Sequence, residues 1–111
     1  MTNFSKYDVV VVKFPFASST KYKARPAVIL SSDIYNTNVR DTLLIMAISS
    51  KTDSALDYEY HISNWKDSGL LKPSIFKSSI ATIEKEYVIS KLGELSEIDI
   101  KKLQILIQEI C

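Results

Sequence analysis

The sequence predicts a mainly β protein, in which a small barrel or sheet of short strands is closed by a C-terminal helix. Three observations lead to this prediction. The chain has 111 residues, which suffices for one domain, residues 1–111, but not for two independent cores. Strand-like apolar segments come first along the chain. The one long pattern with helical spacing follows them at the C-terminal end.

The first strand is the clearest, because residues 8–14 are rich in valine and almost continuously apolar. That pattern is typical of a strand buried on both faces. Pro15 ends this strand, and a polar loop is expected over residues 17–24. The second strand covers residues 25–30. It carries Pro26, whose missing backbone donor favours the beginning or the edge of a strand.

Turns and strands are expected to alternate in the middle of the chain. Residues 31–41 should be irregular, because their Asp and Asn residues favour turns. Residues 42–48 form a third buried strand in this prediction. Apolar and polar side chains alternate over residues 57–63, which predicts a strand with His61 on its outer face. A short helical turn follows over residues 64–69.

The last part of the chain is expected to hold two more strands and the helix. Residues 73–83 favour a strand that need not be continuous, and residues 84–88 favour a single helical turn before a short strand at residues 89–95. The helix should begin at Ser96, whose hydroxyl is a good N-cap. Asp99 follows three residues later, in the place that Glu occupies in a capping box.

Composition excludes several classes of protein. With 14 Lys and Arg against 13 Asp and Glu, the net charge is +1, so binding of nucleic acid through bulk charge alone is disfavoured. A single Cys and a single His exclude a disulfide framework and a Cys or His metal cluster, and we expect no cofactor. No apolar run approaches the ~20 residues that span a bilayer. We therefore expect a soluble, cytoplasmic protein without a membrane partner.

The positive charge is concentrated early in the chain. Residues 1–51 carry seven Lys and Arg against three Asp, and three of these cations lie close together at Lys21, Lys23 and Arg25. A local basic loop on a nearly neutral protein can bind a short polyanion. The same pattern also fits a solvated hairpin turn, so the charges alone leave both interpretations open.

Several short motifs follow one another in order along the chain, beginning with Tyr7–Phe16 and Arg25–Leu30. These two resemble the opening of the MazF/PemK-like toxins of type II toxin–antitoxin modules, whose usual pattern is Gly-Asp-Ile/Val-Val, a loop and Arg-Arg-Pro-Ala. Ala47–Lys51 resembles their Pro-Ile-Thr-Ser motif. Two later segments, Ser68–Ser74 and Lys91–Ser96, match the PemK-like branch. No single motif is specific, but the ordered set covers essentially the whole chain.

The resemblance implies a fold, an activity and partners. The fold is an SH3-like β-barrel with a C-terminal helix, assembled as a homodimer. The activity is that of a metal-independent endoribonuclease, which cuts single-stranded RNA at short sequences. The partner is an antitoxin whose disordered tail lies along the toxin. Two positions transfer by motif as catalytic residues: Arg25 is the Arg of Arg-Pro-Ala, and Ser49 stands at the Thr of Ile-Thr-Ser.

Some positions depart from the family pattern. Tyr7 replaces the usual Gly, Ala24 replaces the first Arg of the pair, and Ser49 keeps the hydroxyl of Thr without its methyl group. Residues 77–82 lack the acidic, amide or Arg residues that some relatives place there. Two other hypotheses therefore stay open: a CcdB-like toxin that binds DNA gyrase, and a family member that binds its antitoxin but has lost catalysis.

The residue types suit cleavage by the 2′-hydroxyl of RNA, which needs no metal. The enzyme must align that hydroxyl, stabilise the pentavalent phosphorus and protonate the leaving oxygen. Arg25 offers a fork of donors that matches phosphate oxygens, and Ser49 can donate one more hydrogen bond. Further contacts to RNA are expected from the residues beside these two motifs: Lys21, Tyr22, Lys23, Ser50 and Lys51.

Overall fold

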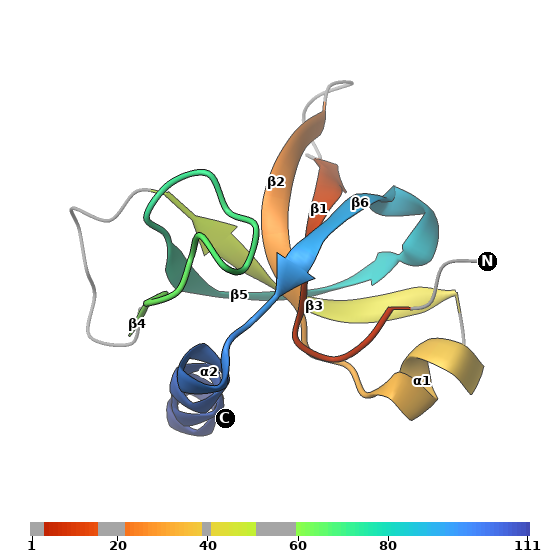
Figure 1. The fold of residues 1–111 in the computed structure, drawn as a ribbon. Helices are drawn as coiled ribbons and strands as arrows, with labels where there is room; N and C mark the ends of the chain where they lie inside the picture. Colours follow the sequence, from red (N-terminus) through yellow and green to blue (C-terminus); the bar gives the residue numbers. More distant parts are fainter. Residues whose placement is uncertain (1–3, 16–21, 39–40, 51–59) are drawn as a thin grey trace.

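In the computed structural model the chain forms one strongly curved sheet, and the C-terminal helix packs against its outer face (Figure 1). The structure describes residues 4–15, 22–38, 41–50 and 60–111. Its elements, in order, are β1 (Asp8–Pro15), β2 (Tyr22–Ile29), α1 (Asp33–Asn38), β3 (Thr42–Ser49), β4 (Tyr60–His61), β5 (Ile75–Glu84), the 3-10 turn η1 (Lys85–Tyr87), β6 (Val88–Glu94) and α2 (Glu97–Ile110).

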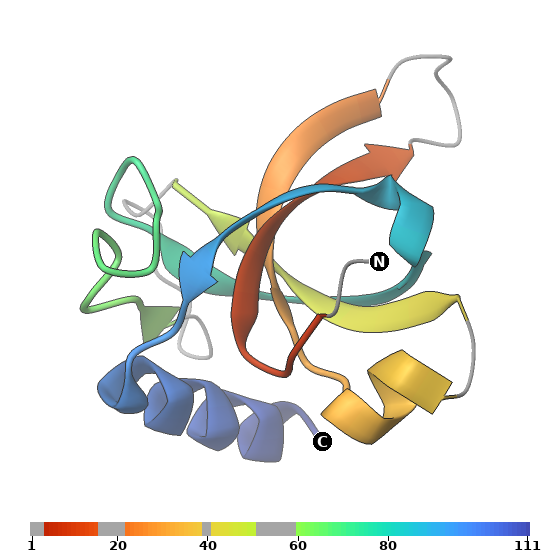
Figure 2. The same ribbon diagram turned by 45° about the vertical axis from the view of Figure 1, so that its right-hand side comes forward.

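The strands are ordered β4-β5-β3-β2-β1-β6, and every neighbouring pair is antiparallel. The sheet curls into a barrel-like shape without closing, and Figure 2 looks into its concave side. The predicted fold class, a small mainly β barrel with a C-terminal helix, is confirmed in this form.

Two apolar clusters fill the two faces of the curved sheet. The barrel cluster lies within the curve and consists of Phe4, Val10, Val12, Ala27, Ile29, Leu43, Ile45 and Ile83. The helix cluster lies between the sheet and α2 and consists of Val9, Val28, Leu30, Met46, Ile48, Ile62, Leu70, Phe76, Leu95, Leu103 and Leu106. Because β1, β2 and β3 contribute to both clusters, their sequences are nearly continuous in apolar residues instead of alternating.

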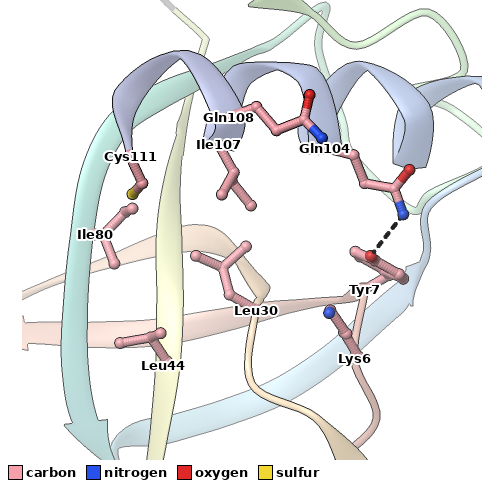
Figure 3. A pocket seen from close by; sticks show the side chains of 9 residues that line it. All are labelled: Lys6, Tyr7, Leu30, Leu44, Ile80, Gln104, Ile107, Gln108 and Cys111. Atoms are coloured by element: carbon pink, nitrogen blue, oxygen red, sulfur yellow. Dashed lines mark hydrogen bonds between the residues drawn. The ribbon is translucent and has the colours of Figure 1, made fainter.

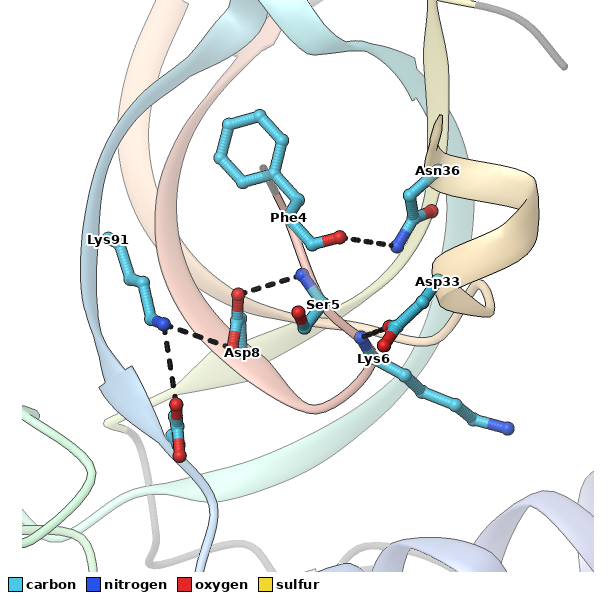
Figure 4. Close-up of polar contacts among 8 residues, drawn as sticks. Phe4, Ser5, Lys6, Asp8, Asp33, Asn36 and Lys91 are labelled. Carbon is cyan, nitrogen blue, oxygen red and sulfur yellow. Dashed lines mark hydrogen bonds and ion pairs between the residues drawn. The ribbon is translucent and has the colours of Figure 1, made fainter. Parts of the chain in front are cut away.

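The N-terminal segment is fixed by buried polar side chains (Figure 4). Asp8 is only 2% exposed; its carboxylate accepts a hydrogen bond from the Ser5 amide at 2.9 Å and lies 3.3 Å from the Lys91 ammonium of β6. Burial lowers the pKa of Lys91, but the hydrogen bonds and charges of Asp8 and Glu94 together outweigh this effect, so the net shift of that pKa is upward. The pair therefore holds β1 and β6 together at the base of the sheet.

The backbone at Tyr7 has a φ of +74°, the only left-handed non-glycine conformation in the described part of the chain. This is the position where the family pattern has Gly. A left-handed conformation costs an ordinary residue ~1–2 kcal/mol, which Gly avoids. The Tyr7 ring offsets part of this cost, since it packs against the helix cluster and its hydroxyl accepts a hydrogen bond from Gln104 at 3.2 Å.

The prediction of an irregular segment over residues 31–41 is wrong, because α1 occupies residues 33–38. The Ser32 hydroxyl accepts a hydrogen bond from the Tyr35 amide at the start of this helix, as an N-cap does. Asn36, expected in a turn, is buried, and its amide donates to the carbonyl oxygen of Phe4 (Figure 4). The same amide also donates to the carbonyl oxygen of Ser31. Long-range contacts thus override the turn preference of its type.

The second strand is longer than predicted. β2 begins at Tyr22, so the last residues of the expected 17–24 loop are paired with the end of β1. Pro26 lies inside the strand and not at its beginning. β3 pairs with β2 only from Ala27 to Ile29, so β2 has an open side at Pro26, as the missing donor requires.

The remaining predictions concern short elements. Of the expected strand over residues 57–63, β4 covers only Tyr60–His61, Ile62 and Ser63 lie outside it, and residues 57–59 are outside the described part. The 3-10 turn η1 confirms the helical turn predicted over residues 84–88.

The start of the C-terminal helix follows the sequence prediction and adds a further contact. The Ser96 hydroxyl caps α2 by accepting the Asp99 amide at 3.3 Å. The Asp99 carboxylate is fully buried and accepts the backbone amides of Ser63 at 2.7 Å and Asn64 at 2.9 Å. Asp at this position therefore ties the helix to the segment after β4. Within the described residues, no helix has the length and apolar character needed to cross a bilayer.

Candidate active site

A polar pocket lies on the barrel-cluster face of the sheet, where the buried apolar residues of β2 and β3 give way to polar ones. Alternation along a strand sends every second side chain to the same face. On β2 the buried Ala27 and Ile29 are thus followed towards the N-terminal end by Arg25, and on β3 the buried Leu43 and Ile45 are followed by Ala47 and Ser49. The pocket has a volume of about 270 Å³ and is lined by Arg25, Ala47, Ile48, Ser49, Lys77 and Ser79.

Strand β5 enters this pocket through a bulge. Met46 is paired with Ile80 and Ile48 with Phe76, so the single residue Ala47 faces three residues of β5, residues 77–79. A bulge bends a strand locally and changes the direction of its side chains, and such irregularities are common beside active sites. The strand expected over residues 73–83 is thus one strand with an irregularity in its middle, at the pocket.

The pocket combines positive charge with hydroxyl groups. Arg25 and Ser79 are exposed, and Ser49 and Lys77 are half-buried. The six lining residues include two cations and no carboxylate. A guanidinium, an ammonium and two hydroxyl groups around one depression are the donors that suit a phosphate group.

The structure brings the two predicted catalytic residues to the same pocket, with Arg25 on β2 and Ser49 on β3. Lys23 is exposed and lies two residues before Arg25 on the same strand. Ser50 is exposed and lines a different pocket. Lys21 and Lys51 lie outside the described residues, as does the side chain of Tyr22.

Sequence reasoning missed two lining residues, Lys77 and Ser79. Counting alternate residues back from the buried Ile83 assigns both to the barrel-cluster face, so one signal was present in the sequence. The bulge was not predictable, because it depends on how β5 is paired with β3. His61, by contrast, is exposed on β4 as predicted and is not among the residues that line this pocket.

A larger pocket of about 620 Å³ lies between α2 and the sheet (Figure 3). Its apolar lining includes Leu30, Leu44, Ile80 and Ile107, and its polar lining includes Lys6, Gln104 and Gln108. Leu44 and Ile80 are each 37% exposed, although they belong to central strands. Apolar surface of this kind suits contact with another protein more than chemistry. In the described part of the chain, no three Asp, Glu, His or Cys side chains are grouped as metal ligands.

The fold is that of a small, barrel-like β protein with a C-terminal helix, and the sequence comparison gives its family. Residues 5–111 match the family described as the PemK-like, MazF-like toxins of type II toxin–antitoxin systems. The chain therefore belongs to this family. No curated protein sequence resembles the chain closely enough to count as a match.

Several solved structures share the fold. A mycobacterial endoribonuclease in complex with its cognate antitoxin is 16% identical, with a TM-score of 0.74 over 98% of this chain and 93% of that one. The Mycobacterium tuberculosis toxin MazF-mt6 is 20% identical, with a TM-score of 0.73 over 92% of this chain and 93% of that one. The MazE–MazF complex of Deinococcus radiodurans is 14% identical, with a TM-score of 0.78 over 99% of this chain and 96% of that one.

Proposed function

We propose that this toxin is a metal-independent endoribonuclease that cuts single-stranded RNA at short sequences. The observation that supports the proposal is the pocket in which Arg25, Ser49 and Lys77 meet. Membership of the MazF-like family also supports the proposal, and some structural neighbours are themselves named endoribonucleases. Arg25 and Ser49 are the catalytic residues in this proposal.

The reaction uses the 2′-hydroxyl of the substrate as the nucleophile. Its oxygen forms a bond to the adjacent phosphorus, its proton passes to water, and the bond from phosphorus to the 5′-oxygen breaks. The leaving 5′-oxygen takes up a proton from water, so the products carry a 2′,3′-cyclic phosphate and a 5′-hydroxyl. Arg25 stabilises the charge on the pentavalent phosphorus, because a guanidinium is a fixed positive fork of donors that matches phosphate oxygens.

The other lining groups have supporting roles. The Ser49 hydroxyl donates a hydrogen bond to a phosphate oxygen, and Lys77 adds a second positive charge from β5. Lys23 is exposed on β2 and holds a neighbouring phosphate. Lys21, Tyr22, Ser50 and Lys51 remain predicted RNA contacts.

We also propose an antitoxin and a second copy of this chain as protein partners. Two of the structural neighbours are complexes with an antitoxin. The apolar lining of the pocket beneath α2, where Leu44 and Ile80 are exposed, supports a surface that is covered in an assembly (Figure 3).

Incubating the purified protein with a long RNA in the presence of EDTA tests the activity. Mapping of 5′ ends should give 5′-hydroxyl fragments cut at a recurring short sequence. Arg25→Ala should lower the cleavage rate by ~10²–10³-fold, the usual loss for one transition-state donor. Lys77→Met should lower it less.

Two variants serve as matched controls. Lys101→Met removes an exposed cation of α2, and His61→Gln removes the single His of the chain, which does not line the polar pocket. Both should cleave nearly as well as the wild type. If folded Arg25→Ala protein cleaves at the wild-type rate, the assignment of the active site is wrong. If the folded wild type does not cleave RNA, the hypothesis of a family member without catalysis is favoured.

A further inference from the structure

The two segments that resemble the PemK-like branch, residues 68–74 and 91–96, are in direct backbone contact. Gly69 has a φ of +88°, and a Cβ at this position would lie 2.3 Å from the carbonyl oxygen of Leu92. A Cβ at Gly93 would lie 2.6 Å from the carbonyl oxygen of Ser68. Both distances exclude any side chain. These are the only two glycines of the chain, and both serve this one contact.

This contact fixes one wall of an apolar groove. The leucine groove, as we call it, has a volume of about 370 Å³ and lies between the segment after Gly69 and strands β1 and β2. Its lining includes Leu70, Leu71 and Leu92, together with Val11 and Pro26, which are paired between β1 and β2. Leu71 is 93% exposed, more than any other large apolar side chain in the described part of the chain.

The leucine groove and the polar pocket, which is the catalytic pocket of the proposed function, are lined by residues that are neighbours in the chain. Ala24 and Ser50 line the groove, and their chain neighbours Arg25 and Ser49 line the catalytic pocket. Adjacent residues are ~3.8 Å apart and point to opposite faces of a strand. The two depressions therefore lie on opposite faces of the sheet. Because β3 pairs with β2 only from Ala27 to Ile29, both depressions adjoin an open edge of β2, around which one bound polymer can pass.

We propose that the leucine groove binds a nucleobase of the RNA strand next to the cleaved phosphate, an inference that rests on the proposed function. The aliphatic faces of Leu71 and Leu92 hold the flat base, and the Ser50 hydroxyl bonds to its edge. Lys72 is the one charged residue of the lining and faces the adjoining phosphate. The volume suits a small planar group, since sites for small molecules measure ~300–1,000 Å³.

Substituting Leu71 tests the groove without unfolding the protein, because a side chain that is 93% exposed contributes little to the core. The wild type, Leu71→Ser and Leu71→Trp are incubated with an RNA pool of random sequence, and the cut sites are read from the 5′ ends. Leu71→Ser should reduce the preference for one base at one position beside the cut by ~10-fold. Leu71→Trp should retain or raise that preference, because an indole offers a larger flat surface.

Ile98→Ser is the matched control, since it removes an exposed apolar side chain from α2, which contributes no residue to the groove. Its cut-site profile should equal that of the wild type. If Leu71→Ser has the wild-type profile and cleavage rate, no base occupies the groove. If that variant instead loses self-association in sedimentation while its profile is unchanged, the groove is a protein contact. If the wild type does not cleave the pool, the proposed function fails and the base site with it.

Discussion

Replacing Asp99 with Ala should destabilise the protein by about 3 kcal/mol more than replacing Glu97 with Ala. Both residues are acidic and lie in the first turn of α2, so the interaction with the helix dipole, ~0.3–1 kcal/mol, is common to the two substitutions. Only Asp99 is buried, and its carboxylate accepts the amides of Ser63 and Asn64. A hydrogen bond to a charged group contributes ~1.5–3 kcal/mol. The lower value applies here because Ser63 is exposed, which gives about 3 kcal/mol for two bonds.

Urea unfolding of the wild type, Asp99→Ala and Glu97→Ala at the same protein concentration measures this difference in the free energy of unfolding. The fluorescence of Trp65, the single Trp, reports on the segment after β4, because Trp65 follows Asn64 in the chain and packs against the helix cluster. At about 4 °C per kcal/mol, the melting temperatures of the two variants should differ by about 12 °C. Asp99→Asn keeps one acceptor oxygen and should lie between them. A difference below ~1 kcal/mol between Asp99→Ala and Glu97→Ala would show that water replaces the carboxylate, and the reasoning would fail.

Two further predictions concern the backbone and the surface charge. Tyr7→Gly should be more stable than Tyr7→Ala by ~1 kcal/mol in thermal unfolding, the reverse of the usual order, because both variants lose the ring but only Ala keeps a Cβ at φ +74°. The pKa of Glu84 is raised by a hydrogen bond shared with Glu86, by the charge of that carboxylate, by burial and by Asp41. A carboxyl group whose pKa is raised in the folded state stabilises the fold at pH values below its ordinary pKa. This stabilisation is lost as the pH rises through the raised pKa. Glu84→Gln should therefore raise the melting temperature at neutral pH and have less effect in acid; an equal effect at both would contradict this cause.

Local signals in the sequence predicted much of the fold. Ser96 followed by Asp99 located the start of α2, and the valine run of β1 indicated a strand buried on both sides. These predictions succeeded because each depends on neighbouring residues. α1 was missed because Asn36 turns inward to bond with Phe4, a partner that is distant in the sequence.

The site was predicted in part. Arg25 and Ser49 came from motifs, and the structure places both at one pocket, whereas Lys77 enters it through a bulge that depends on the pairing of β5 with β3. The leucine groove also depends on a long-range contact, because nothing near Gly69 in the sequence indicates that it meets Leu92.

One continuous set of contacts links the helix cap to the groove. The Asp99 carboxylate holds the Asn64 amide, and the Asn64 carbonyl accepts the Ser68 amide and hydroxyl, each at 3.1 Å. Ser68 in turn lies against Gly93, where no side chain fits between the two segments. The residues that line the polar pocket belong to β2, β3 and β5, and none of them is among the residues of this set of contacts. Loosening the cap should therefore alter the groove wall before it alters the polar pocket, so under the two proposals above the preference for a base should change before the rate of RNA cleavage does.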